Sequence, residues 1–232
     1  GGQAVEVDWN DSLGTMKVLD AWRRGIDLEY PFEAATANVP TVSRKPLARR
    51  ADHPMRYGEI PFVDKPVSRL VLGVDNQVDL PHGSAMFDDF FERGGNCFDT
   101  AYIYGGGRCE RVLGQWLRNR GIRDEVVVID KGAHTPHCDP ESITRQLFES
   151  LERLQTDFVD IYFMHRDNLD VPVSEFVDVL DEHARAGRIK AYGGSNWSLA
   201  RIEEANAYAR AHGKREFVAV SDNFSLAHML EP

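Results

Sequence analysis

The chain has 232 residues, of which 42% are hydrophobic and 10% aromatic, which is enough apolar material for the core of one domain of ordinary size. Its 27 Lys and Arg against 37 Asp and Glu give a net charge of −10, which argues against binding to nucleic acid or to an anionic membrane surface, and no apolar stretch approaches the length of a transmembrane helix. The three cysteines show no Cys-x-x-Cys spacing, which favours a reducing compartment, and we expect a cytoplasmic protein.

The first 54 residues differ in pattern from the rest. Residues 1–9 alternate weakly, as a strand does, and Asp11 or Ser12 is expected to cap a helix that Gly25 ends. This strand and helix have a faint similarity to the closing elements of the glucose-fructose oxidoreductase-like dehydrogenases, so residues 1–33 are interpreted as the remnant of an upstream domain. Residues 34–54 lose the periodicity and are rich in proline and arginine, which predicts a linker whose basic cluster is solvated.

From residue 55 onward, a small hairpin is followed by apolar segments that alternate with amphipathic segments about every thirty residues. The apolar segments predict strands over residues 70–73, 97–100, 126–129, 158–164, 190–194 and 217–220. Capping residues predict helix starts at Ser84, Asp139, Ser174 and Ser198, and glycines predict helix ends at Gly94, Gly121, Gly187 and Gly213. In the first of these helices, Met86, Phe87, Phe90 and Phe91 are expected to face inward.

Six apolar strands that alternate with five helices predict a parallel β/α architecture, either a doubly wound sheet or a (β/α)8 barrel. No Gly-x-Gly-x-x-Gly follows the first strand, as a Rossmann unit requires. Polar residues follow successive strands, and the carboxyl ends of barrel strands converge on one mouth. These residues are Asp99, Lys131, His165, Ser195, Asn196 and Ser221. We therefore predict an α/β fold of the (β/α)8 TIM-barrel type over residues 55–232, with an N-terminal extension.

The residues at this mouth could carry out proton transfer. A phenol donates its proton poorly at neutral pH unless a neighbouring cation stabilises the phenolate. Lys131 is expected to stabilise the phenolate of Tyr104, and Asp99 to hold Lys131 charged and in position. His165 could donate to a substrate carbonyl or orient it, either as imidazole or as imidazolium.

The run Asp99-Thr100-Ala101-Tyr102-Ile103-Tyr104-Gly105, followed by Lys131 and His165, resembles the aldo-keto reductase family over about residues 55–232. The resemblance implies reduction of a small aldehyde, ketone or sugar with NADP or NAD as cofactor, or the reverse oxidation, with Asp99, Tyr104, Lys131 and His165 as the catalytic set. It implies that Ser195 and Asn196 hydrogen-bond the nicotinamide carboxamide. Ser221 stands where the family commonly has Gln, and its shorter side chain is expected to reach the nicotinamide less well.

The family barrel has eight β/α units, whereas the resemblance stops after the sixth strand. We therefore expect a truncated barrel, a piece that lacks the last two units and the residues that grip the adenosine phosphate. Two alternatives remain open. The chain could be a nucleotide-binding regulatory or scaffolding barrel with little turnover. The loop bearing His134, His137, Cys138 and Asp139 could hold a metal, but it is interpreted as the substrate entrance, and no metal is expected.

Overall fold

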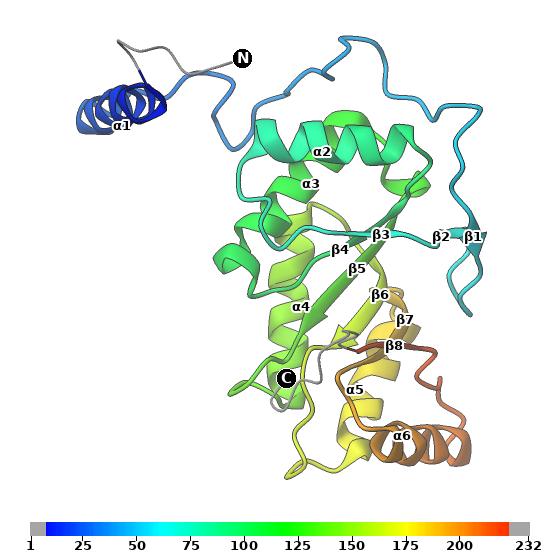
Figure 1. Ribbon diagram of the computed structural model, residues 1–232. Coiled ribbons are helices and arrows are strands. Elements are labelled where there is room, and N and C mark those ends of the chain that lie inside the picture. Colours follow the sequence, from blue (N-terminus) through cyan, green and yellow to red (C-terminus); the bar gives the residue numbers. More distant parts are fainter. Residues whose placement is uncertain (1–7, 223–232) are drawn as a thin grey trace.

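The computed structural model describes residues 8–222, which form an N-terminal helix, a small hairpin and a curled parallel sheet with helices along it (Figure 1). The hairpin pairs β1 (Tyr57–Gly58) with β2 (Val67–Ser68) in antiparallel fashion. The sheet contains six parallel strands, β3 (Val71–Gly73), β4 (Cys97–Asp99), β5 (Val127–Gly132), β6 (Val159–Met164), β7 (Ile189–Ser195) and β8 (Ala219–Ser221).

The strands lie in the sheet in the same order as in the chain, from β3 to β8. A doubly wound sheet reverses its strand order part-way, so this order distinguishes the curled sheet from the alternative left open by the sequence. The helices between the strands are α2 (Leu80–Glu92), α3 (Arg108–Arg120), α4 (Pro140–Leu154), α5 (Val173–Arg185) and α6 (Leu199–Ala211), and each packs against the next. The described part of the chain is thus a six-strand arc of a (β/α) barrel, which confirms the predicted fold class.

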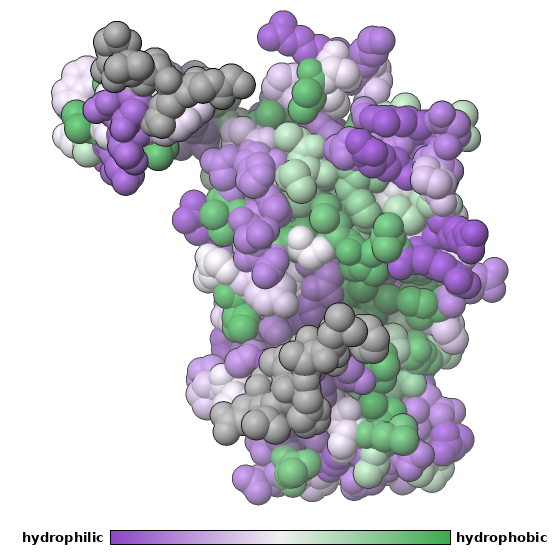
Figure 2. Space-filling model, in the orientation of Figure 1, coloured by the Kyte–Doolittle hydropathy of each residue, from purple (hydrophilic) through white to green (hydrophobic). Residues whose placement is uncertain are grey.

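The alternation of residues along each strand separates two apolar layers. Val127, Ile129 and Ile161 belong to the layer inside the curl, whereas Val128 and Tyr162 pack against the helices on the outside. Lys131 has the same parity as Val127 and Ile129, so its side chain is directed into the curl. Figure 2 shows apolar residues gathered over the strands, with polar residues around them.

The two edge strands of the arc leave apolar side chains in contact with solvent. Val71 of β3 is 46% exposed and Val220 of β8 is 55% exposed. No helix among residues 8–222 is both long and apolar enough to cross a bilayer.

Several predicted helix starts need correction. Helix α2 begins after Asp79, whose carboxylate accepts from the His82 amide at 2.9 Å, and Pro81 occupies the first turn, so the predicted cap Ser84 lies buried inside the helix. Met86 was expected to face inward, but it is 43% exposed because the buried side of α2 is formed by Phe87 and Phe91. The helix ends at Glu92, just before Gly94.

The other observed caps lie closer to the positions predicted from the sequence. Asp139 caps α4 and Ser198 caps α6, as predicted. Helix α5 begins two residues earlier than a Ser174 cap would place it, because Pro172 occupies the capping position. Helix α3 is followed by Gly121 with a φ of 66°, the left-handed backbone predicted for a glycine stop.

The N-terminal helix α1 (Trp9–Gly25) has no buried residue. Its cap is Asp8, whose carboxylate accepts from the Asp11 amide at 2.8 Å, so the prediction of Asp11 or Ser12 as cap was wrong, whereas the end at Gly25 is as predicted. The strand predicted over residues 1–9 falls mostly outside the described residues, and Trp9 opens the helix.

The segment 34–54 runs along α3 without regular secondary structure. Asn119 donates to the Ala37 carbonyl at 2.8 Å, and Arg120 donates to the Val39 carbonyl at 2.7 Å.

Candidate active site

All seven residues predicted for the site line one cavity of about 400 Å³ at the carboxyl ends of the strands. Asp99, Ser195 and Ser221 are the last residues of β4, β7 and β8, and Lys131 and His165 lie at the end of β5 and directly after β6. Because parallel strands point the same way, residues distant in the chain meet at this edge. The complete lining is Val71, Gly73, Asp99, Tyr104, Lys131, His165, Arg166, Ser195, Asn196, Ser221 and Asp222.

Tyr104 is carried by the segment between β4 and α3. The Thr100 amide donates to the Ile129 carbonyl at 2.9 Å and the Tyr102 amide to the Lys131 carbonyl at 2.8 Å, so the start of this segment continues the pairing of β4 with β5. Tyr104 then opens a short 3-10 helix, η1 (Tyr104–Gly107), in which Gly105, Gly106 and Gly107 have φ values of 56°, 63° and 85°. These left-handed conformations favour glycine, and they turn the chain into α3.

Lys131 lies between an acid and a phenol. Its ammonium forms an ion pair with Asp99, donates to the Thr100 carbonyl at 3.1 Å and donates to the Tyr104 hydroxyl at 3.4 Å. Lys131 is only 4% exposed, so the charge interacts through poorly screened surroundings. Burial raises the pKa of the Asp99 carboxyl, and the adjacent ammonium opposes that shift. The predicted contact of Lys131 with both Asp99 and Tyr104 is present.

His165 faces the same group of side chains. Its ring meets the Tyr104 ring edge-on, with 5.8 Å between centroids, and the His134 ring in the same manner at 4.8 Å. Burial, together with Lys131, His134 and Arg166, lowers the pKa of His165 to about 3. The imidazole is therefore neutral at physiological pH, which decides between the two charge states that the sequence left open.

Ser195, Asn196 and Ser221 form the opposite corner of the cavity. The Ser195 hydroxyl donates to the Ser221 carbonyl at 2.9 Å, the Asn196 amide N–H donates to the same carbonyl at 3.2 Å, and the Asn196 side chain donates to the Ser195 hydroxyl at 3.2 Å. Asn196 adopts a φ of 55°, which turns the chain sharply after β7. Ser221 acts here through its backbone carbonyl, whereas the sequence directed attention to its side chain.

Comparison with known proteins agrees with this geometry. A sequence profile of the aldo/keto reductase family matches residues 70–232. The chain belongs to the aldo/keto reductase family. It is 30% identical to a norsolorinic acid reductase of Aspergillus flavus over 173 residues, which cover 67% of this chain and 43% of that protein. It is 31% identical to a probable aryl-alcohol dehydrogenase of Saccharomyces cerevisiae over 146 residues, or 57% and 44% of the two chains.

A bacterial relative is similar at the same level. An uncharacterized oxidoreductase of Bacillus subtilis is 33% identical over 173 residues, which cover 66% of this chain and 52% of that protein. The chain thus spans about half, or less, of the length of these curated relatives. The hairpin of β1 and β2 lies before the part of the chain that matches the family profile.

Sequence reasoning missed Arg166 in the lining of this aldo/keto reductase cavity. Its guanidinium donates to the His165 carbonyl at 3.0 Å, and its position directly after His165 at a strand end was the signal that could have found it. Asp167, the next residue, forms an ion pair with Arg201 of α6 at 2.9 Å, which attaches the segment after β6 to the barrel wall.

In the loop considered for a metal, residues 134–139, three of the four candidate ligands make other contacts. His134 packs against His165, the Cys138 thiol donates to the Arg166 carbonyl at 2.9 Å, and Asp139 caps α4. Within residues 8–222, no group of three or more His, Cys, Asp and Glu side chains is placed to hold a metal ion.

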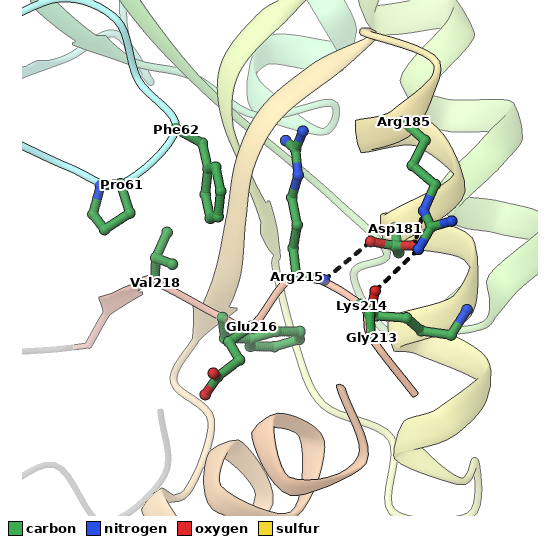
Figure 3. A pocket seen from close by; sticks show the side chains of 10 residues that line it. Pro61, Phe62, Asp181, Arg185, Gly213, Lys214, Arg215, Glu216 and Val218 are labelled. Atoms are coloured by element: carbon green, nitrogen blue, oxygen red, sulfur yellow. Dashed lines mark hydrogen bonds and ion pairs between the residues drawn. The ribbon is translucent and has the colours of Figure 1, made fainter. Parts of the chain in front are cut away.

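A larger cavity, of about 620 Å³, lies at the opposite end of the strands between the hairpin and the start of β8 (Figure 3). Asp181 accepts from the Arg215 amide at 3.0 Å and forms an ion pair with Arg185 at 2.6 Å. The Arg215 guanidinium lies 4.6 Å from the centroid of the Phe62 ring, so it connects the hairpin to the wall. None of the predicted site residues lines this cavity.

Proposed function

We propose that this aldo/keto reductase reduces the carbonyl of a small aldehyde, ketone or sugar with NADPH or NADH, or oxidises the corresponding alcohol. The observation that carries the proposal is the buried Lys131 ammonium, which pairs with Asp99 and donates to the Tyr104 hydroxyl at 3.4 Å. The relatives named above, a reductase and a probable aryl-alcohol dehydrogenase, support the same class of reaction. The free thiols of Cys97, Cys109 and Cys138 are all buried and support a reducing compartment such as the cytoplasm.

In this proposal, Tyr104 is the general acid and base. Reduction places negative charge on the carbonyl oxygen, which then needs a proton. The Tyr104 hydroxyl can give this proton because the Lys131 ammonium beside it stabilises the resulting phenolate. Asp99 positions the ammonium through the ion pair. In the oxidation direction the phenolate takes the proton back.

His165 is proposed to orient the substrate carbonyl as a neutral hydrogen-bond donor. Its pKa of about 3 means that it carries no charge near neutral pH, so it polarises the carbonyl without competing with Tyr104 as the proton source. Its Nδ1 is buried and has no hydrogen-bond partner among residues 8–222. The His165 residue lines the cavity, so its ring can face a carbonyl bound there.

The corner formed by Ser195, Asn196 and Ser221 fits a nicotinamide carboxamide, which needs both donors and acceptors. Hydroxyl and amide side chains supply both kinds of group without adding charge. When bound, the cofactor supplies the hydride. The role of these residues is to orient its carboxamide while the tyrosine and lysine lie across the same cavity.

The proposal is tested by following cofactor oxidation over a panel of aldehydes, ketones and sugars, with wild type and the Tyr104→Phe variant side by side. Cofactor affinity is measured separately by fluorescence. We expect turnover by wild type, none by the variant and similar cofactor affinity for both. Substantial residual turnover by the variant contradicts the role of Tyr104. Cofactor binding by wild type without turnover on any substrate favours the regulatory or scaffolding alternative.

A further inference from the structure

We propose that Arg153 of α4 is a positioning residue, which holds the segment that carries Tyr104 in reach of Lys131. This inference rests on the proposed function, because it takes Tyr104 as the proton donor. The contacts of Arg153 with the loop do not depend on that function. We refer to residues 100–107 as the tyrosine loop. The first half of this loop is held by the Thr100 and Tyr102 amides, which pair with β5. The second half is the short helix η1 with three successive glycines, and it needs a support outside the loop.

Arg153 contacts the tyrosine loop on both sides of Tyr104. On one side, its Nη1 donates to the Tyr102 carbonyl at 3.1 Å, and its guanidinium carbon lies 4.4 Å from the centroid of the Tyr102 ring. On the other side, a Cβ atom added to Gly107 would lie 2.7 Å from the Arg153 guanidinium, so the glycine backbone lies directly against it. The Arg153 guanidinium therefore contacts the loop both before and after Tyr104.

The guanidinium is itself fixed by two acids. Its Nη1 donates to Glu110 of α3 at 2.8 Å, and its Nη2 donates to Glu149 of α4 at 3.1 Å. Glu110 is completely buried, so Arg153 is the charge that compensates it. Glu149 also accepts from the Tyr102 hydroxyl at 2.8 Å, which closes a ring of contacts between α4 and the loop.

Arginine suits this place for a geometric reason. Its planar fork donates in several fixed directions at once and stacks on an aromatic ring, whereas a lysine ammonium is a single point charge on a flexible stem. Arg153 satisfies a carbonyl, two carboxylates and a ring in this way. A lysine could still compensate the charge of Glu110. Its single ammonium could not keep the contacts with the carbonyl, both carboxylates and the ring at the same time.

The consequence concerns the distance between Tyr104 and Lys131. At 3.4 Å their hydrogen bond is already near the upper limit of such contacts, so a small outward movement of the loop would break it. Misplacement of a reacting group by about 1 Å can cost up to about a hundredfold in rate. Arg153 thus acts on the chemistry through the loop and touches neither the substrate nor the cavity.

The test uses Arg153→Lys, which retains a cation for Glu110 but loses the fork. Wild type and variant are labelled with fluorotyrosine, and the Tyr104 resonance is assigned by its loss in Tyr104→Phe. For each protein we measure thermal stability, the Tyr104 resonance with and without the additional change Lys131→Met, and kcat and KM. Arg118→Lys is the matched control, because Arg118 is an exposed arginine on α3 that contacts Gln155 instead of the loop.

We expect Arg153→Lys to melt close to wild type, to shift the Tyr104 resonance and to abolish the response of that resonance to Lys131→Met. We expect kcat to fall about tenfold to a hundredfold with KM for the cofactor unchanged. Arg118→Lys should behave as wild type. A folded Arg153→Lys protein with an unmoved resonance that still responds to Lys131→Met overturns the proposal.

A second variant covers the case in which Arg153→Lys does not fold. Glu149 is partly exposed, so Glu149→Ala removes the acceptor shared by Arg153 and the Tyr102 hydroxyl at little cost in stability. We expect a smaller shift of the Tyr104 resonance, and an unmoved resonance overturns the proposal. The resonance reports loop position whether or not the protein turns over a carbonyl substrate, so failure of the proposed function is distinguishable from failure of this inference.

Discussion

The Lys131 ammonium donates a hydrogen bond to the Tyr104 hydroxyl at 3.4 Å, although the two residues come from different β/α units of the barrel. The contact exists because the tyrosine loop continues the pairing of β4 with β5 before it turns away. The same ammonium pairs with Asp99 at the end of β4. A buried cation is therefore held where a phenolate would form. Its removal should lower kcat more than it lowers cofactor affinity.

Substitution of Lys131 by Met should lower kcat by about a hundredfold to ten-thousandfold, the usual range for loss of general acid–base catalysis. The reason is that the Tyr104 phenolate loses its stabilising cation. The cofactor corner at Ser195 and Asn196 is untouched, so cofactor affinity should stay within about threefold. Steady-state kinetics and fluorescence titration measure the two quantities.

Lys214→Met serves as the control for this change, because Lys214 pairs with Asp178 near the opposite end of the strands, at 3.2 Å. It should retain full activity. Equal losses of kcat and of cofactor affinity in Lys131→Met would contradict a role confined to the proton donor.

The low pKa of His165 predicts a pH dependence of stability. In the folded protein this pKa is about 3, whereas an unfolded histidine has about 6.5, so the unfolded chain binds the extra proton between these values. Stability from this group is fully present above about pH 6.5 and is lost as the pH falls toward 3. Between pH 7 and pH 5 the loss should be about 2 kcal/mol.

This contribution is measured by denaturant unfolding at pH 7 and pH 5. The His165→Gln variant should lose less stability than wild type across this interval, by roughly the 2 kcal/mol assigned to His165. His137→Gln is the control for the loss of a histidine, because His137 is exposed in the loop before α4. Identical pH dependence in wild type and His165→Gln would show that His165 is not held neutral.

Asp160 of β6 predicts a large effect on stability at the other end of the barrel. This carboxylate is completely buried and pairs with Lys65 at 2.7 Å, Arg123 at 2.9 Å and Lys190 at 3.7 Å. Asp160→Asn leaves these cations without their shared partner, and loss of one member of a buried ion pair costs about 3–5 kcal/mol. Urea unfolding should show a loss of this size.

Asp157→Asn is the matched control for Asp160→Asn, because Asp157 is exposed three residues earlier in the same segment. It should change stability by less than about 0.5 kcal/mol. A loss of under 1 kcal/mol in Asp160→Asn would mean that the cations find solvent or other acceptors when the carboxylate is removed.

The sequence predicted the parts of the fold that depend on local periodicity. The strand positions and the order of polar residues at strand ends were recognisable, because buried parallel strands are nearly all apolar and a side chain at the end of one strand stands out. Ser84 was mistaken for a cap because serine is a common capping residue, whereas Asp79 followed by Pro81 gave the stronger signal for the start of α2.

Long-range contacts could not be predicted in the same way. The sequence placed Lys131 near Asp99 and Tyr104 by resemblance, but it contained no signal that Arg153 of α4 reaches the tyrosine loop. It also left the charge of His165 open, because that charge depends on burial and on Lys131 and His134, which come from other segments. These features follow from how α3 and α4 pack on the strands, which periodicity does not specify.

The final prediction concerns Asp130, the neighbour of Lys131 on the helix-facing side of β5. Asp130 is completely buried, and neither oxygen of its carboxyl has a hydrogen-bond partner among residues 8–222. Burial and the nearby Glu110 raise its pKa well above the usual value, and Lys131 only partly opposes this. The folded state therefore keeps a proton that the unfolded chain releases above about pH 4, so stability falls as the pH rises from there.

Asp130→Asn replaces this acid by a neutral group of nearly the same shape. The stability of Asp130→Asn relative to wild type should be higher at pH 8 than at pH 5, because only the wild-type carboxyl carries this proton-linked loss of stability. Denaturant unfolding at both values measures this, with the exposed Asp170→Asn as control. An equal stability difference between Asp130→Asn and wild type at pH 5 and pH 8 would mean that the Asp130 carboxyl keeps the same charge in the folded and unfolded states.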